Sequence, residues 1–230
     1  MTRTPFQGDL IITIDGPAGA GKTTISKLLA RTLGYRYLDT GALYRGVAYA
    51  VQQAGIDPKD GEALRVLCRG LTLGLEDGGQ GLRLILNGED ITARIRTPEI
   101  SMLASAVSAR PLIREFLLEI QRAIGREKRV VCEGRDMGTV VFPGADVKFF
   151  LDAAPGIRAR RRFEELKAMS ESAPSLEAVE ADMIRRDHND RTRAAAPLIP
   201  AADAVRVDSS ALSVEQVVEA MLDDIRQRFH

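Results

Sequence analysis

Residues 10–14 (Leu-Ile-Ile-Thr-Ile) and the turn that follows, Gly16-Pro17-Ala18-Gly19-Ala20-Gly21-Lys22-Thr23, decide the fold. The first stretch is an apolar run, which is typical of a strand buried within a parallel sheet. From Lys22 onward the apolar residues recur at helical spacing until Gly34, where a helix can end. A strand, a glycine-rich turn and a helix in this order are the opening of an α/β fold.

The turn matches the pattern GxxxxGK[ST] of a phosphate-binding loop at each fixed position. In such a loop, consecutive backbone N–H groups and the N-terminus of the helix bind a polyphosphate. Lys22 would reach the β- and γ-phosphates, and the Thr23 hydroxyl would be a ligand of Mg²⁺. The predicted nucleotide-binding residues are Gly16, Pro17, Ala18, Gly19, Ala20, Gly21, Lys22, Thr23 and Thr24.

The rest of the chain alternates between strand-like and helical segments. Short apolar stretches predict strands at 35–38, 130–132, 147–151 and 204–207, and helical spacing marks 42–54, 99–108, 112–124, most of 155–193, and a last helix. Ser213 and Gln216 form a capping box at the start of that last helix. We therefore predict an α/β fold, a parallel sheet with helices on both faces, with ligands bound at the carboxyl ends of the strands.

Two segments differ in character from this core. Between residues 57 and 98, glycine-rich turns separate strand-like stretches at 71–75 and 82–86, and Asn87-Gly88 is a hairpin signal. Residues 155–193 are helical and highly charged. The sequence predicts one domain, 1–230, with a core (about 1–56, 99–154 and 194–230), a small α+β insert (57–98) and a helical lid (155–193).

Composition excludes several classes of protein. The 32 Lys and Arg are balanced by 32 Asp and Glu, so binding of a nucleic-acid polymer or an anionic membrane by bulk charge is not expected. Without a long apolar segment or a secretory leader, the sequence indicates a cytoplasmic protein. Its two cysteines and two histidines are spaced for neither a disulfide framework nor a metal site. No long apolar stripe is left uncovered, so a monomer is expected.

Arginine is favoured over lysine, which supplies only six of the 32 basic residues. Arginines follow a strand or a glycine turn in three motifs, at 38–45, 134–139 and 185–193, and Arg158, Arg161 and Arg162 share one helix face. Each cluster alone is more often a solvated, ion-paired surface. Together with a phosphate loop they favour phosphoryl transfer, which needs cations around the transferred group and exclusion of water.

A phosphate loop specifies a nucleoside triphosphate but not a reaction. A GTPase would also carry Asn-Lys-x-Asp, which is absent, and a motor would carry an apolar strand ending in a metal-binding acid, for which 130–133 (Val-Val-Cys-Glu) is a weak match. A kinase acting on a second phosphate-bearing ligand is favoured. A nucleotide-dependent switch or scaffold that transfers no phosphate stays open.

Four motifs taken together resemble the bacterial type of cytidylate kinase: Ile-Asp-Gly-Pro-Ala-Gly-Ala-Gly-Lys-Thr-Thr at 14–24, Leu-Asp-Thr-Gly-Ala-Leu-Tyr-Arg at 38–45, Gly-Arg-Asp-Met-Gly-Thr-Val-Val-Phe-Pro at 134–143, and Ala-Pro-Leu-Ile-Pro-Ala-Ala-Asp-Ala at 196–204. They occur in the family's order over residues 10–229. The resemblance implies a nucleoside monophosphate kinase of pyrimidine metabolism that transfers the γ-phosphate of ATP to CMP or dCMP with Mg²⁺. It also implies a core, a nucleotide-binding insert and a mobile lid.

The resemblance further implies a role for individual residues. The cytosine would be read by Ser105, Arg114 and Asp136; the acceptor phosphate would be held by Arg45, Arg135 and Arg193, and the sugar by Arg186 and Asp190, with Thr40 also in the CMP site. The catalytic residues would be Lys22, Arg135 and Arg193, with Arg158 and Arg161 supplied by the lid. The same fold could instead serve another acceptor, such as UMP, AMP or shikimate.

Overall fold

The computed structural model describes residues 8–77, 82–169 and 174–229. Residues 1–7, residues 78–81 of the predicted insert, residues 170–173 of the predicted lid and residue 230 lie outside this part. The chain forms two compact units. The first comprises Met1–Tyr37, Glu127–Thr192 and Ala196–His230, and the second comprises Leu38–Arg126 and Arg193–Ala195. The division into a core, a nucleotide-binding insert and a lid stays a prediction.

A five-stranded sheet has the order β2-β6-β1-β7-β8. Its strands are β1 (Ile11–Asp15), β2 (Arg36–Asp39), β6 (Val130–Gly134), β7 (Val147–Asp152) and β8 (Val205–Asp208). β1 is central and pairs in parallel with β6 and β7, and β7 pairs in parallel with β8. All five residues of β6 are buried, as expected for a parallel strand covered on both faces. The predicted α/β class is confirmed.

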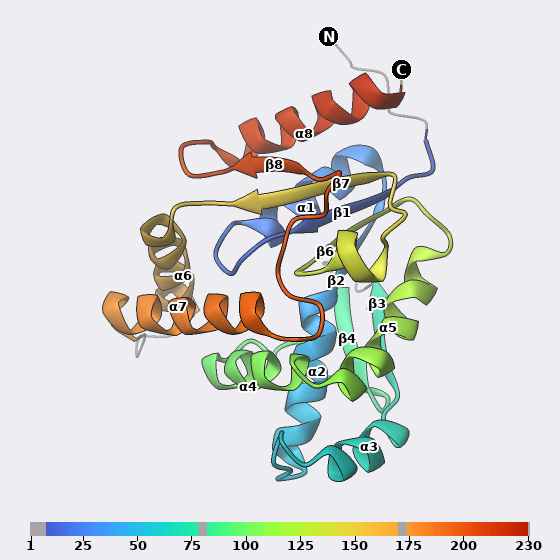
Figure 1. Cartoon of the computed structure of the whole chain (residues 1–230), viewed down its shortest axis with the longest axis vertical. Helices are drawn as coiled ribbons and strands as arrows, with labels where there is room; N and C mark the ends of the chain where they lie inside the picture. Colours follow the sequence, from blue (N-terminus) through green and yellow to red (C-terminus); the bar gives the residue numbers. More distant parts are fainter. Residues whose placement is uncertain (1–7, 78–81, 170–173, 230) are drawn as a thin grey trace. The chain divides into compact units, whose positions relative to one another are not determined.

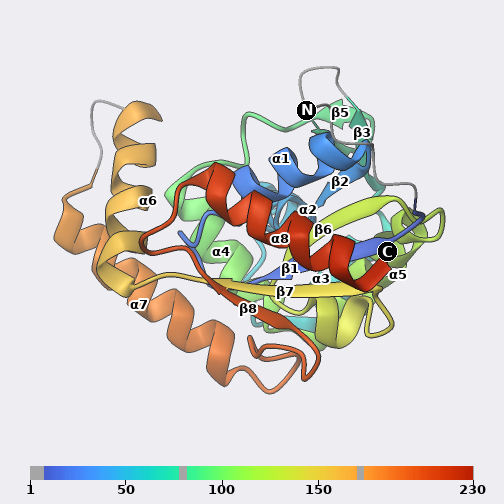
Figure 2. The same ribbon diagram turned by 90° about the horizontal axis from the view of Figure 1, so that it is seen from above.

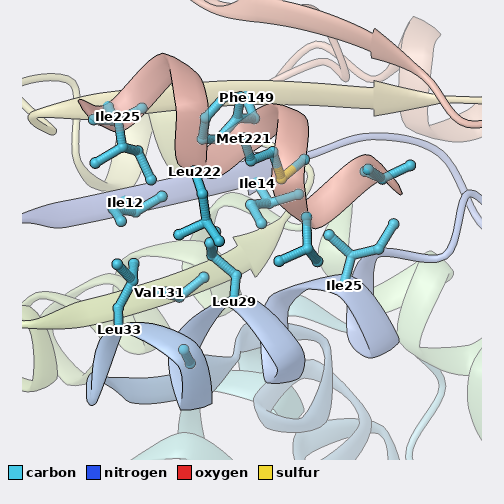
Figure 3. Packing of buried hydrophobic residues seen from close by; sticks show 14 of the residues in the cluster. Ile12, Ile14, Ile25, Leu29, Leu33, Val131, Phe149, Met221, Leu222 and Ile225 are labelled. Atoms are coloured by element: carbon cyan, nitrogen blue, oxygen red, sulfur yellow. The ribbon is translucent and has the colours of Figure 1, made fainter. Parts of the chain in front are cut away.

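The helices α1 (Lys22–Leu33) and α8 (Val214–Phe229) cover the sheet in the first unit. Gly34, in the left-handed conformation at φ 68°, ends α1 where the sequence predicts. The predicted capping box of α8 is confirmed, because the Gln216 amide donates to the Ser213 hydroxyl and the Ser213 amide donates to the Gln216 side chain. Figure 3 shows the buried side chains that meet in this core, Ile25, Leu29 and Leu33 from α1, Met221, Leu222 and Ile225 from α8, and Ile12, Ile14, Val131 and Phe149 from the strands.

A helical hairpin follows the end of β7. It consists of α6 (Pro155–Met169) and α7 (Leu176–Thr192), which lie side by side in both views (Figure 1 and Figure 2). Its small apolar core includes Ala159 and Met183, and Ala18 of the phosphate loop packs against the same cluster. The hairpin therefore touches the phosphate loop directly.

The second unit combines helices with a separate small sheet. Its elements are α2 (Thr40–Gln53), α3 (Gly61–Arg69), β3 (Leu73–Asp77), β4 (Leu82–Leu86), β5 (Glu89–Asp90), α4 (Pro98–Ser108) and α5 (Pro111–Gly125). The strands form an antiparallel sheet in the order β3-β4-β5. Asn87 and Gly88 both have positive φ, as a tight two-residue turn between β4 and β5 requires, which confirms the predicted hairpin. Within the described residues, none of the helices has the length and apolarity to cross a membrane.

Candidate active site

The phosphate loop joins the end of β1 to the start of α1 in a path that only glycine can follow at two positions. Gly16 has φ 153°, and a Cβ there would lie 1.9 Å from the carbonyl oxygen of Leu151 at the end of β7. Gly19 has φ 74°, and a Cβ there would lie 2.7 Å from the carbonyl oxygen of Arg158 on α6. The loop is thus seated against both β7 and the helical hairpin.

Lys22 is buried at the start of α1, and its Nζ donates to the Pro17 carbonyl oxygen at 2.7 Å. Burial lowers the pKa of Lys22, and the neighbouring positive charge of Arg135 lowers it further, whereas the carboxylates of Glu133 and Asp15 act in the opposite direction. A desolvated ammonium inside a glycine loop is suited to receive the negative oxygens of a polyphosphate.

Thr23 lies beside a carboxylate that the sequence analysis noted only as a weak match. Its hydroxyl donates to Oε1 of Glu133 at 2.8 Å, and the hydroxyl of Tyr37 donates to the same oxygen. Glu133 is buried in β6, adjacent to Ile14 of β1. A hydroxyl and a carboxylate at the phosphate loop are oxygen ligands of the kind that Mg²⁺ prefers. The part of the chain that the structure describes contains no cluster of three acidic, histidine or cysteine side chains fit to hold a metal alone. Phosphate oxygens and water would therefore complete the coordination.

Arg135, which directly follows β6, forms an ion pair with Asp190 of α7. The distance from Arg135 Nε to Asp190 Oδ2 is 2.8 Å. Burial alone would lower the pKa of Arg135, but Asp190 opposes this and the pKa lies above its ordinary value. Asp136 is buried beside Arg135, and Arg186 stands one helical turn before Asp190. Four residues predicted to bind CMP therefore lie within the first unit: Arg135 and Asp136 after β6, and Arg186 and Asp190 on α7, with the ion pair between Arg135 and Asp190 joining the two segments.

The predicted lid arginines have defined partners. Arg158 is buried, and its guanidinium donates to the carbonyl oxygens of Ala153 (2.9 Å) and Ala18 (3.0 Å). Its Nη1 also lies 2.8 Å from Oδ2 of Asp187. The side chain of Arg158 thus joins α6 to the phosphate loop and to α7.

Arg161 instead contacts the segment after β8. It donates to the hydroxyl (3.0 Å) and the carbonyl oxygen (2.7 Å) of Ser209. The Ser209 hydroxyl in turn donates to the Ala20 carbonyl oxygen of the phosphate loop at 3.1 Å. Arg162 pairs with the exposed Glu165 of the same helix at 2.7 Å. Asp187 lies within the motif at 185–193, but sequence reasoning gave it no role, and Ser209 was missed because it belongs to no motif.

The second unit holds the remaining predicted CMP residues. Arg114 and Arg193 meet at one residue, since Arg114 donates to the Ser108 carbonyl oxygen (3.3 Å) and Arg193 to the Ser108 hydroxyl (3.2 Å). That hydroxyl donates to the Ser105 carbonyl oxygen at 2.8 Å. The Arg114 guanidinium lies 5.5 Å from the ring centre of Tyr44. Ser108 was not predicted; sequence placed it only as the end of a helix.

Thr40 and Arg45 lie on α2. Thr40 is buried at the first position of the helix, directly after the capping residue Asp39. Arg45 forms an ion pair with Asp39, with 2.9 Å between Arg45 Nη2 and Asp39 Oδ2. Asp39 therefore both caps α2 and orients the arginine.

The family model described as cytidylate kinase matches residues 12–227. The chain belongs to the cytidylate kinase family. The cytidylate kinase of Citrifermentans bemidjiense is 49% identical over 222 residues, which are 96% of this chain and 95% of the relative. That of Geobacter sulfurreducens is 51% identical over 219 residues, 95% and 94% of the two chains. A crystal structure of an uncharacterized protein from Eubacterium ventriosum, 12% identical, has a TM-score of 0.50 over 94% of this chain and 98% of that chain, and shares the fold alone.

The matched span of this cytidylate kinase contains every residue assigned to the site. Within the first unit these are the phosphate loop, Arg135, Asp136, Arg158, Arg161, Arg186 and Asp190, and within the second unit they are Thr40, Arg45, Ser105, Arg114 and Arg193. Their individual roles in binding stay predictions.

Proposed function

We propose that this cytidylate kinase transfers the γ-phosphate of ATP to CMP or dCMP, giving CDP or dCDP and ADP, in pyrimidine nucleotide metabolism. The observation that carries the proposal is the match to cytidylate kinases over residues 12–227. The phosphate loop with its buried lysine supports it, because both are needed to bind the donor.

On the donor side, the loop amides and Lys22 bind the ATP phosphates, and Lys22 neutralises charge that develops during transfer. Thr23 and Glu133 would hold Mg²⁺, which when bound would add positive charge at the phosphate oxygens. Arg158 keeps the loop in place through the Ala18 carbonyl, and Arg161 contributes positive charge from the lid.

On the acceptor side, Asp136 accepts a hydrogen bond from the exocyclic amine of cytosine, while Ser105 and Arg114 donate to acceptors on the ring. Asp190 engages Nε of Arg135 and the Gly134 carbonyl oxygen accepts from Nη1 at 3.4 Å, so the guanidinium is held in one orientation, from which Nη2 would bind a phosphate oxygen. The other proposed acceptor contacts are Thr40, Arg45, Arg186 and Arg193. The acceptor phosphate is already ionised near neutral pH, so no general base is required.

The experiment that tests this function is a coupled assay of ADP release with a panel of acceptors. CMP and dCMP should give the highest kcat/KM, ahead of UMP, AMP and shikimate. A different best acceptor would refute the assignment of Ser105, Arg114 and Asp136 to cytosine.

A second assay separates a kinase from a protein that only binds ATP. Lys22→Ala and Arg193→Ala should each form far less CDP than the wild type, because each loses a cation at the transferred or the accepting phosphate. Equal CDP yields from all three proteins would defeat the mechanism. A monomeric state and a cytoplasmic location stay predictions, testable by light scattering and by cell fractionation.

A further inference from the structure

Asp15 is the last residue of β1 and directly precedes the phosphate loop. Its side chain is buried and accepts two backbone hydrogen bonds, from the Met137 N–H to Oδ1 and from the Gly138 N–H to Oδ2, each 2.8 Å long. These two amides open the π-helical turn η1 (Met137–Val141), which directly follows Arg135 and Asp136. One carboxylate therefore ties the end of β1 to the segment that carries two proposed acceptor contacts.

The turn is also held closely from the sheet side. A Cβ on Gly138 would lie 3.1 Å from both Lys148 Cδ and Thr13 Oγ1, a tight contact with side chains of β7 and β1 that a larger residue could make only by displacing them slightly. Beyond the turn, Nζ of Lys148 donates to the Pro143 carbonyl oxygen at 2.5 Å. We therefore expect a change at Asp15 or Gly138 to alter the position of this turn.

The charge on Asp15 is unfavourable to folding. Burial raises the pKa of Asp15 to about 6, although the hydrogen bonds from Gly138 and Met137 lower it. The phosphate-loop pattern itself begins at Gly16 and asks for no acid before it. The phosphate-loop pattern does not require a carboxylate at position 15, and burying its charge destabilises the fold. We therefore attribute the presence of Asp15 to the backbone amides that it holds in place rather than to a contribution to stability.

We propose that Asp15 is a positioning residue for the acceptor nucleotide. By fixing the amides of Met137 and Gly138, it sets the positions of Arg135 and Asp136, and through them the KM for CMP and the preference for cytosine. This inference rests on the proposed function, since it takes Arg135 and Asp136 as acceptor contacts.

The first test is Asp15→Asn, which keeps the volume but leaves one carbonyl oxygen for two N–H donors. At pH 7.5 we expect the KM for CMP to rise about tenfold or more, the usual effect of losing a hydrogen bond to a charged group, with the KM for ATP changing less than about threefold. The matched control is Ser26→Ala on α1, outside the contacts that hold the turn. The Ser26 hydroxyl is buried and has no hydrogen-bond partner among the described residues, so this variant should keep both KM values.

The second test uses pH, because a protonated Asp15 resembles asparagine. The ratio of the KM for CMP of Asp15→Asn to that of the wild type should fall toward one as pH drops below about 6. The ratio cancels the titration of the CMP phosphate, which also occurs near pH 6. The charged and titratable groups around Asp15 are Lys22, Cys132, Glu133, Arg135, Asp136 and Lys148. Because the Asp15 charge raises the pKa of Lys22, the KM for ATP is measured over the same pH range as the control for the donor site.

Gly138→Ala is a second variant, to be used if Asp15→Asn does not fold. It changes the contacts of the same turn with Thr13 and Lys148 instead of those with Asp15. Gly138 does not have positive φ, so alanine is allowed there and acts only through the 3.1 Å contacts. A CMP-selective rise in KM in either variant supports the proposal. Unchanged KM for CMP, or equal rises for CMP and ATP, would overturn it. If the wild type showed no CMP kinase activity, the proposed function itself would be refuted. If the wild type were active and Asp15→Asn had the same KM for CMP, only the role of Asp15 would be refuted and the proposed function would stand.

Discussion

Removal of Asp190 should destabilise the protein far more than removal of an exposed acid from the same helix. Asp190 retains 8% of its side-chain exposure and Arg135 21%, with 2.8 Å between the paired atoms. Asp190→Ala would leave a largely buried guanidinium without its carboxylate. Breaking a buried pair in this way typically costs about 3–5 kcal/mol. Because Arg135 keeps some contact with solvent, we expect roughly 2–4 kcal/mol at pH 7.

The measurement is the free energy of unfolding in urea, with Asp182→Ala as the control. Asp182 pairs with Arg185 on α7 at the same distance of 2.8 Å, but the two side chains are 49% and 59% exposed. That pair should contribute about 0–1 kcal/mol. The double variant Asp190→Ala with Arg135→Met should recover part of the loss, because no unpaired charge is left. Equal losses for Asp190→Ala and Asp182→Ala would refute the reasoning.

Two further predictions concern the donor site. Glu133→Gln should raise the Mg²⁺ concentration needed for half-maximal CDP formation by about 10- to 100-fold, because the carboxylate beside Thr23 is lost. A magnesium titration of the activity measures this, and an unchanged titration would show that Glu133 is not part of the metal site. The pKa of Lys22 is lowered, so its charge is lost at a lower pH than that of an ordinary lysine. The kcat/KM for ATP should therefore decline as pH rises above neutrality in the wild type, and this decline should be weaker in Lys22→Arg; parallel profiles of the two proteins would contradict the prediction.

Local sequence signals predicted the parts of the fold that depend on neighbours in the chain. The apolar run before Gly16, the Asn87-Gly88 turn and the capping box at Ser213 are each determined within a few residues, and all three are confirmed. The family resemblance added the order of the motifs over nearly the whole chain.

Contacts between distant parts of the chain could not be predicted in this way. Glu133 meets Thr23 across 110 positions, and Asp15 meets Met137 across 122, only because β1 and β6 are neighbours in the sheet. Pairing Arg158 with Asp187 likewise requires the packing of α6 on α7. The position of an acidic residue in the sequence does not by itself predict which cation, hydroxyl or amide its side chain will contact in the folded protein.

The most direct test of the central claim is the stoichiometry of a single reaction mixture containing the wild type, ATP, Mg²⁺ and CMP. Quantified by chromatography, CDP and ADP should form in equal amounts, and omission of CMP should stop the release of ADP. ADP released without CDP would indicate hydrolysis, and no turnover would indicate a protein that only binds nucleotide; either result would contradict the account.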